Sequence, residues 1–132
     1  RRTAVGTDYN RVNLLMAVIE KHMGIQMGDY DAYVNVAGGM KITEPAMDLA
    51  LVTALIGSYR NRVISSDTIV FGEVGLSGEV RAVSQAEQRV LEAKKLGFNR
   101  CILPSVCVKS LKDISGIEII GVNNIREACD KL

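Results

Sequence analysis

Apolar residues recur every three or four positions near the start of the chain, and Gly24 follows them with the left-handed preference that ends many helices. The recurring positions are Leu14, Leu15, Val18, Ile19, His22 and Met23. Asp8 or Asn10 is placed to cap the first turn. The pattern therefore predicts a first helix that ends at Gly24.

A second helix is predicted from residues 46–56, which are apolar nearly all round. Pro45 favours a first helical turn because its missing N–H is not needed there, and Thr43 or Glu44 is a suitable cap. A helix that is apolar on every side is buried, so we expect this one in the interior.

A third helix follows the tetrapeptide SQAE at residues 84–87, which has the sequence of a capping box. In such a box Ser84 accepts from the N–H of residue 87, and Glu87 reaches back. The helix is expected to run through Val90 and Ala93 to Gly97. The final segment, NNIREACDKL, predicts a capped helix at the end of the chain.

Short runs between these helices predict strands. TAVGTD at 3–8 is expected to form an edge strand, and DAYVNVAGG at 31–39 a strand that leads into a turn. TIVFGEVGLSGEVRAV at 68–83 predicts two short strands, a hairpin or near-hairpin around Gly75 to Gly78. Two further strands are predicted at 100–104 (RCILP) and 116–122 (GIEIIGV). Strands and helices interleave irregularly, and one strand pair is antiparallel. This order predicts an α/β or α+β class with layered packing.

Length and composition limit the number of domains. With 132 residues and 48% hydrophobic content, the chain is expected to bury one core and not two, as a single domain spanning 1–132. No run approaches the roughly 18 apolar residues of a membrane span, and no secretory leader is visible. We therefore expect a soluble cytoplasmic protein without a membrane partner. The chain opens at Arg1-Arg2 without a methionine, which indicates a piece of a longer protein.

Charge and cysteine content exclude several classes. Sixteen basic and fifteen acidic residues give a net charge of +1, so any contact with DNA would need a local patch. Cys101, Cys107 and Cys129 are odd in number and lack CxxC spacing. We expect reduced thiols, with neither a disulfide nor a metal site.

Five segments carry a resemblance to a known family. They are DYNR at 8–11, YVNVAGG at 33–39, EPAMDLA at 44–50, FGEVGLSGEVR at 71–81 and VSQAEQR at 83–89. In this order they resemble the proteolytic domain of Lon-type serine proteases, and more closely the C-terminal Lon-like domain of the RadA (Sms) family of bacterial DNA repair proteins. The resemblance implies a Lon-like fold with a mixed sheet and packed helices, related to the ribosomal protein S5 domain 2-like class.

The resemblance also implies that the protease chemistry is missing. Active Lon proteases carry a nucleophilic serine at the start of the buried helix and a lysine base in the helix after the hairpin. The matching positions here are Ala46 and Glu87, so both members of the dyad are vacant. Loss of the nucleophile of a serine protease lowers the rate about 10⁶-fold. We therefore expect no catalytic residue in this chain.

Other residues do not restore an active peptidase. Lys94 lies seven residues beyond Glu87, about 10 Å further along a helix. Ser77 and Ser84 have turn and cap roles, and His22 belongs to the packed side of its helix. No motif supports a cysteine protease built from His22 and a cysteine. Cleavage of unfolded casein that is abolished by changing one serine would establish this less favoured reading.

Cofactor chemistry is implied only for a longer parent chain. The family combines a zinc-binding segment, a RecA-like ATPase core and this domain. The chain contains no GxxxxGK followed by Ser or Thr, and AGGMK has the wrong spacing for a phosphate loop, so Gly38 and Gly39 are interpreted as turn residues. ATP, Mg and zinc are therefore expected in the absent parts, and no cofactor in this chain.

The main functional hypothesis comes from the activity that the resemblance implies. It processes recombination intermediates by moving branched DNA, and Lon-type domains form six-membered rings. The chain is then a scaffold that supports a hexamer and contacts single-stranded or branched DNA, with a recombinase as a further partner. Basic residues that could contact phosphates are Arg11, Arg60, Arg62, Lys94 and Lys95.

The alternative is an adaptor that keeps the protease groove and binds a peptide without cutting it. An extended segment could add to a strand edge beside the vacant dyad. Salt-dependent DNA binding favours the scaffold, whereas saturable peptide binding that is insensitive to salt favours the adaptor.

Overall fold

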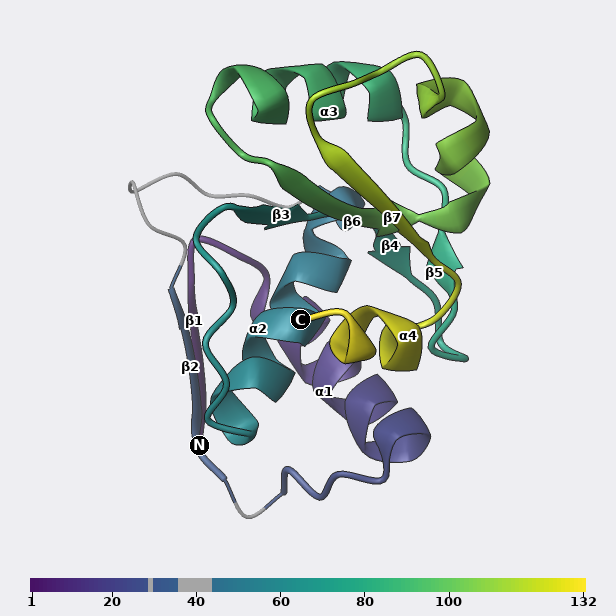
Figure 1. The fold of residues 1–132 in the computed structure, drawn as a ribbon. Coiled ribbons are helices and arrows are strands. Elements are labelled where there is room, and N and C mark those ends of the chain that lie inside the picture. Colours follow the sequence, from purple (N-terminus) through teal and green to yellow (C-terminus); the bar gives the residue numbers. More distant parts are fainter. Residues whose placement is uncertain (29, 36–43) are drawn as a thin grey trace.

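A computed structural model describes residues 1–28, 30–35 and 44–132 (Figure 1). Its elements are β1 (Arg2–Val5), α1 (Tyr9–Met23), β2 (Ala32–Asn35), the 3₁₀ helix η1 (Pro45–Met47), α2 (Asp48–Tyr59), β3 (Thr68–Val70), β4 (Glu73–Val74), β5 (Val80–Arg81), α3 (Ala86–Lys95), β6 (Arg100–Pro104), the 3₁₀ helix η2 (Ser105–Leu111), β7 (Glu118–Val122) and α4 (Ile125–Asp130). The turn predicted at Gly38 and Gly39 and the cap predicted at Thr43 lie outside the described residues.

Within these residues the strands form three small sheets. The central one is parallel with the order β3-β6-β7, β1 and β2 form a parallel pair, and β4 and β5 form the predicted antiparallel hairpin. The mixture of parallel and antiparallel strands with packed helices confirms the predicted α/β class. The two short strands expected in 68–83 are three, because the chain breaks between β3 and β4 at Gly72, whose φ is 157°.

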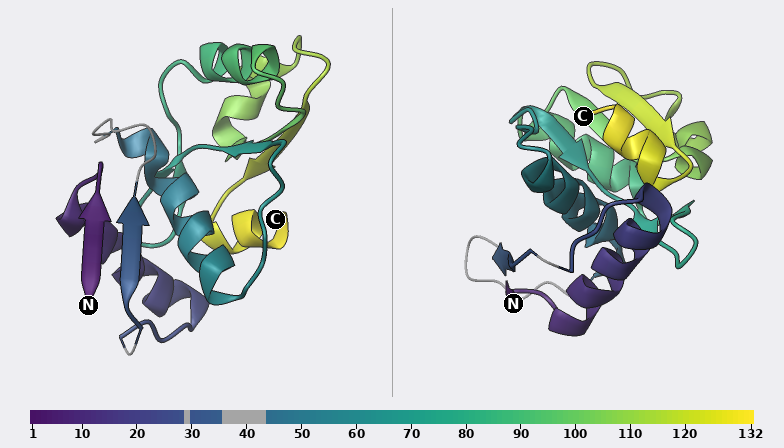
Figure 2. Two further views of the ribbon diagram at one scale, coloured as in Figure 1. Left: turned by 90° about the vertical axis from the view of Figure 1, so that its left-hand side faces the viewer. Right: turned by 90° about the horizontal axis from the view of Figure 1, so that it is seen from below.

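The central sheet separates two layers of helices. Figure 1 shows α3 and η2 on one side of it, with α1, α2 and α4 on the other, and the views in Figure 2 agree. Successive side chains of a strand point to opposite faces. Accordingly, Cys101 and Leu103 of β6 pack with α3, whereas Ile102 belongs to the cluster formed with α1 and α2. The apolar side chains therefore form two clusters, one on each face of the sheet, where a single core was expected. The single domain over 1–132 stays a prediction.

Local caps set three of the helix ends. Asp8 Oδ1 accepts from the N–H of Asn10 at 2.9 Å, which identifies Asp8 as the cap of α1. Gly24 ends this helix with a φ of 67°. At the other end of the chain, Asn124 Oδ1 accepts from the N–H of Glu127 at 2.9 Å. These predictions are confirmed because each depends on residues close together in sequence.

The capping box predicted at 84–87 is wrong. The N-cap of α3 is Gln85, in the left-handed region with a φ of 58°, and no side chain caps the helix there. The helix therefore begins one residue later than a box starting at Ser84 requires. The carbonyl of Ser84 instead accepts from Arg89 Nε at 2.9 Å. Glu87 lies exposed in the first turn.

Two substitutions test whether the Ser84 side chain caps α3, as that of Asn124 caps α4. Asn124→Ala should lower the free energy of unfolding by about 1 kcal/mol because it removes a side-chain cap. Ser84→Ala should change it by less than about 0.5 kcal/mol, since the Ser84 hydroxyl caps nothing. Urea denaturation of both variants measures the difference. A loss of about 1 kcal/mol with Ser84→Ala would restore the capping box.

The three cysteines are free and buried. Burial raises the pKa of Cys101 to about 12 and the pKa of Cys129 to about 11. A thiolate is the reactive form of cysteine, and these pKa values keep both thiols protonated near neutral pH. Cys101 and Cys129 therefore serve as buried side chains of the hydrophobic clusters.

Candidate functional site

The segment that would carry a nucleophile begins with η1. Pro45 occupies its first turn, as predicted, and Ala46 is buried with 5% of its surface exposed. The carbonyl of Ala46 accepts from the N–H of Gly72 at 2.9 Å, and the N–H of Leu49 donates to the carbonyl of Gly72 at 3.0 Å. The connection between β3 and β4 therefore fixes the position of the helix start, and a methyl group stands there.

A buried carboxylate lies at the first residue of α2. Asp48 is 2% exposed and forms an ion pair with Arg11, whose Nε donates to Oδ1 at 2.9 Å and whose Nη2 donates to Oδ2. The N–H of Val74 also donates to Oδ2, at 3.1 Å. The hydrogen bond to Asp48 raises the pKa of Arg11. A helix N-terminus favours an anion, and here the chain supplies that anion itself.

This carboxylate was not among the predicted site residues. Its signal in the sequence is one acidic residue inside the apolar run that follows Pro45. The same contacts assign Arg11 a structural role, because its guanidinium is engaged by Asp48. A small cavity of about 200 Å³ lies beside the pair; its lining is Thr7, Asp8, Arg11, Glu44, Pro45, Met47, Asp48, Leu51 and Glu73.

A second ion pair joins α3 to this helix start. Arg89 Nη2 bonds to Glu44 Oε1, and the guanidinium carbon lies 5.9 Å from the centre of the Phe71 ring. Glu44 is the N-cap residue of η1, one of the two predicted positions, but its side chain makes no cap bond. The ion pair joins the two segments that carry Ala46 and Glu87. Neither a methyl group nor a carboxylate can act as a serine–lysine dyad.

His22 and Ser77 have structural contacts at the β4-β5 hairpin. His22 Nε2 lies 3.0 Å from the carbonyl oxygen of Leu76, and the ring packs beside Gly78. The backbone N–H of Ser77 donates to Glu79 Oε1 at 3.1 Å. The hydrogen bond from Glu79's own backbone N–H, and then this one from Ser77, lower the pKa of the Glu79 carboxyl. The predicted turn and packing roles account for both residues.

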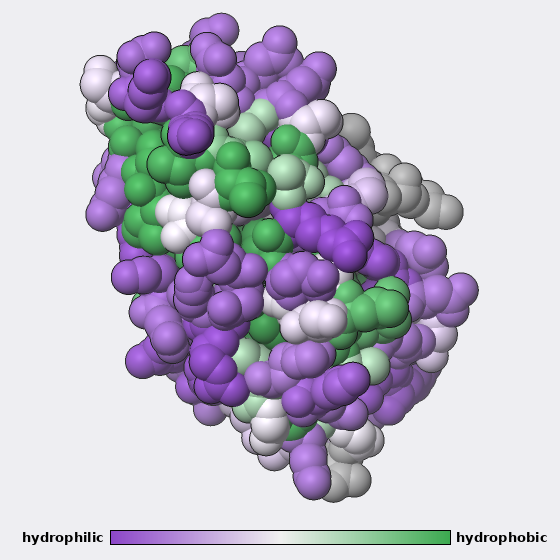
Figure 3. Space-filling view, turned by 90° about the vertical axis from the view of Figure 1, so that its right-hand side faces the viewer, coloured by the Kyte–Doolittle hydropathy of each residue, from purple (hydrophilic) through white to green (hydrophobic). Residues whose placement is uncertain are grey.

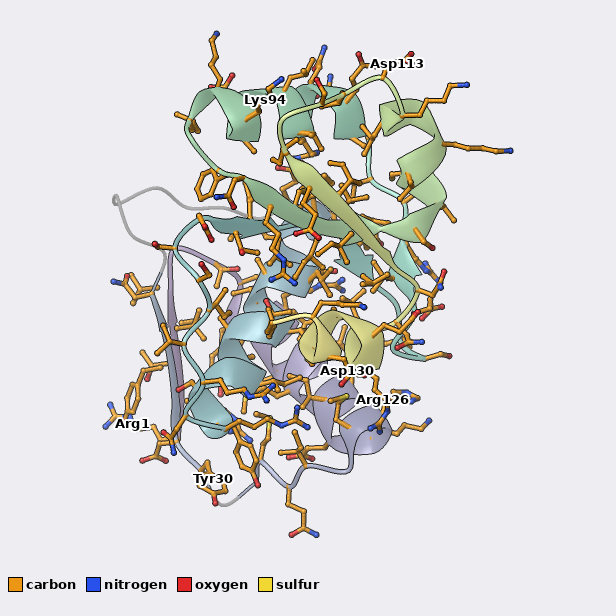
Figure 4. All side chains as sticks on the ribbon, viewed as in Figure 1. Arg1, Tyr30, Lys94, Asp113, Arg126 and Asp130 are labelled. Carbon is orange, nitrogen blue, oxygen red and sulfur yellow. The ribbon has the colours of Figure 1, made fainter. Side chains whose placement is uncertain are left out.

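The predicted basic residues do not form one patch. Arg60 and Arg62 are exposed just after α2, and Lys94 and Lys95 are exposed at the end of α3. Figure 4 shows Lys94 at one end of the molecule and Tyr30, which contacts the last residue of α2, near the other. Their role in DNA binding stays a prediction, with two separate groups of charge.

A larger groove between β2 and α2 was missed by the sequence reasoning. Its volume is about 720 Å³. The lining consists of Met16, Met27, Tyr30, Asp31, Ala32, Tyr33, Val34, Asn35, Met47, Ala50, Leu51, Ala54, Leu55, Ser58, Tyr59 and Asn61. Three of the four tyrosines of the chain are among them. Their positions in sequence have no regular spacing, so no motif indicated that they meet.

The described residues show neither a metal site nor a membrane-spanning helix. Across 1–28, 30–35 and 44–132, no group of three or more His, Cys, Asp or Glu side chains is arranged to hold a metal ion. Over the same residues, each helix is too short or too polar to cross a membrane.

Comparison with known proteins gives one matching family and many relatives. The family described as subunit ChlI of Mg-chelatase matches residues 2–106. DNA repair protein RadA of Bacillus subtilis is 52% identical over 128 residues, and its Escherichia coli counterpart is 47% identical over 128 residues; each alignment covers 97% of this chain. RadA of Haemophilus influenzae is 46% identical over 132 residues, or 100% of the chain.

The chain spans 28% of the length of each of these relatives. At this identity over nearly the whole chain, the predicted resemblance to the RadA family is confirmed.

Proposed function

The chain belongs to the family described as subunit ChlI of Mg-chelatase, and we propose that it is a non-proteolytic, Lon-like scaffold domain of a RadA-type DNA repair ATPase. The observation that carries the proposal is the pair of side chains at the former dyad, Ala46 and Glu87, in a chain whose relatives are DNA repair proteins. In this proposal ATP hydrolysis, branch migration, Mg and zinc belong to other parts of the parent chain.

The non-proteolytic part is supported by the chemistry around η1. Serine–lysine catalysis needs a hydroxyl group and a neutral amine that accepts its proton. Position 46 offers a methyl group, and the carboxylate of Asp48 already lies at the positive end of α2. The ion pairs Arg11–Asp48 and Arg89–Glu44 hold this segment in place. The segment is suited to a structural role.

The ring-forming part is supported by an apolar surface. Figure 3 shows apolar residues gathered on the face that carries η2, and Val106 and Val108 are exposed there. A large exposed apolar patch is typical of an association surface. A head-to-tail contact at such a patch closes into a ring when its rotation fits, and we propose six copies.

The DNA-binding part is supported by exposed basic residues. Arg60 and Arg62 follow α2, and Lys94 and Lys95 end α3. A single domain with a net charge of +1 should bind DNA weakly, but six linked copies raise the effective concentration of these groups. Single-stranded or branched DNA, and a recombinase bound with it, are the proposed partners of the assembled protein.

A charge-removal experiment tests this part. Arg60→Ala/Arg62→Ala should lower the slope of log affinity for a single-stranded oligonucleotide against log salt by about 1.4, since each lost phosphate contact removes about 0.7. Fluorescence anisotropy at several salt concentrations measures the slope, and light scattering gives the mass of the assembly. Lys94→Ala/Lys95→Ala tests the second group in the same titration.

The matched control is Lys21→Ala/Lys131→Ala, which removes the same charge from exposed positions in the last turn of α1 and just after α4. Equal slopes for all three double variants would contradict specific phosphate contacts. A monomer that ignores DNA at low salt would contradict the scaffold itself.

The adaptor is kept as a second candidate because of the groove beside β2. Its lining includes the whole of β2, which pairs with β1 along the described register. An extended peptide could lie along such a strand. Saturable peptide binding that does not change with salt would favour the adaptor over the scaffold.

A further inference from the structure

The groove between β2 and α2 concentrates aromatic side chains at the surface. Tyr30, Tyr33 and Tyr59 line it and are 55%, 65% and 39% exposed. Tyrosine combines a flat apolar ring with a polar hydroxyl group, which suits contact with a partner that is partly wet. The cluster is therefore a candidate for binding a flat, partly polar ligand.

The rings are held in a defined arrangement. The centres of Tyr30 and Tyr59 are 5.3 Å apart, with an angle of 80° between the ring planes. In this edge-to-face geometry one ring turns its edge to the face of the other, and the remaining exposed faces are available to a ligand. Arg2 Nη1 donates to the carbonyl of Tyr30 at 2.9 Å and to that of Met27 at 3.2 Å. The backbone under Tyr30 is thus fixed before any ligand binds, which lowers the cost of binding.

Two basic residues lie next to a lining residue of the groove in the sequence. Asn61 lines the groove, and Arg60 and Arg62 flank it in the chain. The N–H of Arg62 donates to the carbonyl of Gly57 at 2.8 Å, which fixes this turn against α2. Among the lining residues the one charged side chain is the carboxylate of Asp31. The two exposed arginines just after α2 therefore outnumber the negative charge of the lining.

We propose that this tyrosine groove is a stacking platform for unpaired bases of single-stranded DNA, with Arg60 and Arg62 directed to its phosphates. The inference rests on the proposed DNA-binding function and assigns it a site. Aromatic rings beside basic residues bind single strands because every base has a flat face, whereas the bases of a duplex already stack on one another. The charge complementarity favours a nucleic acid over a peptide as the occupant.

Tyrosine substitutions in the 132-residue chain test the platform. Tyr30→Leu and Tyr59→Leu should each weaken binding of an oligothymidylate about tenfold in fluorescence anisotropy, because stacking on the ring is lost. Tyr59→Phe keeps the ring and should stay within about twofold of the parent. Tyr9→Leu is the matched control, since Tyr9 is 48% exposed on α1 and is not part of the groove lining.

A second readout uses the tyrosines themselves. The chain has no tryptophan, and three of its four tyrosines line the groove. Stacking of thymine bases should quench the tyrosine fluorescence of the parent, and Tyr59→Phe should reduce the quenching while affinity is kept. Unchanged fluorescence at saturating oligothymidylate would overturn the proposal.

The outcomes separate the platform from the DNA-binding function. If the tyrosine variants bind oligothymidylate as the parent does while Arg60→Ala/Arg62→Ala loses affinity, the platform is wrong and the function stands. If the parent binds no oligonucleotide at low salt, both are wrong. Equal losses for duplex and single strand would overturn stacking. Tyrosine-dependent binding of a peptide with unchanged oligonucleotide affinity would overturn the platform in favour of the adaptor.

Discussion

Asp48→Ala is expected to lower the free energy of unfolding by about 3–5 kcal/mol, as is typical when one partner of a buried ion pair is removed. The Asp48 carboxylate is 2% exposed and accepts three hydrogen bonds, two from Arg11 and one from the N–H of Val74. Alanine leaves the guanidinium half-buried without its anion and leaves the N–H without its acceptor. Urea denaturation followed by circular dichroism measures the change.

An exposed ion pair provides the control. Arg100 Nε lies 3.5 Å from Glu118 Oε1, and Glu118 is 66% exposed, so Glu118→Ala should cost less than about 1 kcal/mol. Asp48→Asn should fall between the two variants, because its amide oxygen can still accept from Val74. If Asp48→Ala costs no more than Glu118→Ala, the buried pair does not hold the start of α2.

Asp48 also gives the start of the buried helix a structural role. A helix N-terminus presents free N–H groups and positive charge, which proteases and phosphate-binding proteins direct at a ligand. Here Asp48 occupies that end and ties it to α1 through Arg11 and to β4 through Val74. The helix start joins three elements of the fold, a structural role that the proposed scaffold requires.

Sequence reasoning succeeded where the signal is local. The stop at Gly24, a cap at Asp8 or Asn10 and a capped last helix were predicted because these signals act within a few residues, and the structure selects Asp8 and Asn124 as the caps. It failed where a distant contact decides the conformation. Ser84 and Glu87 satisfy the pattern of a capping box, but the carbonyl of Ser84 accepts from Arg89, whose guanidinium also binds Glu44, 45 positions earlier in the chain.

The residues of the candidate site also divide into those with a local sequence signal and those that meet only in the fold. Ala46 and Glu87 were identified by resemblance, because the matching segments are continuous in sequence. Arg11 was grouped with free cations because its partner lies 37 positions further along the chain. Tyr30 and Tyr59 meet only after β2 and α2 pack side by side, so the groove has no signature in the sequence.

The two hydrophobic clusters follow from the alternation of side chains along β6. Truncation of these side chains is expected to have the second large effect on the free energy of unfolding. Leu103→Ala is expected to lower the free energy of unfolding by about 2–5 kcal/mol, because Leu103 is fully buried between the sheet and α3. Ile102→Ala should cost a similar amount from the opposite face of the same strand, where it packs in the other cluster.

The control for both is Leu91→Ala, since Leu91 is 45% exposed on α3 and should change stability by less than about 0.5 kcal/mol. Urea denaturation compares the three variants. A loss in Ile102→Ala alone, with Leu103→Ala no worse than Leu91→Ala, would mean that α3 and η2 do not form a packed layer. Two comparable losses would mean that both faces of the sheet stabilise the fold, as one strand with alternating buried side chains requires.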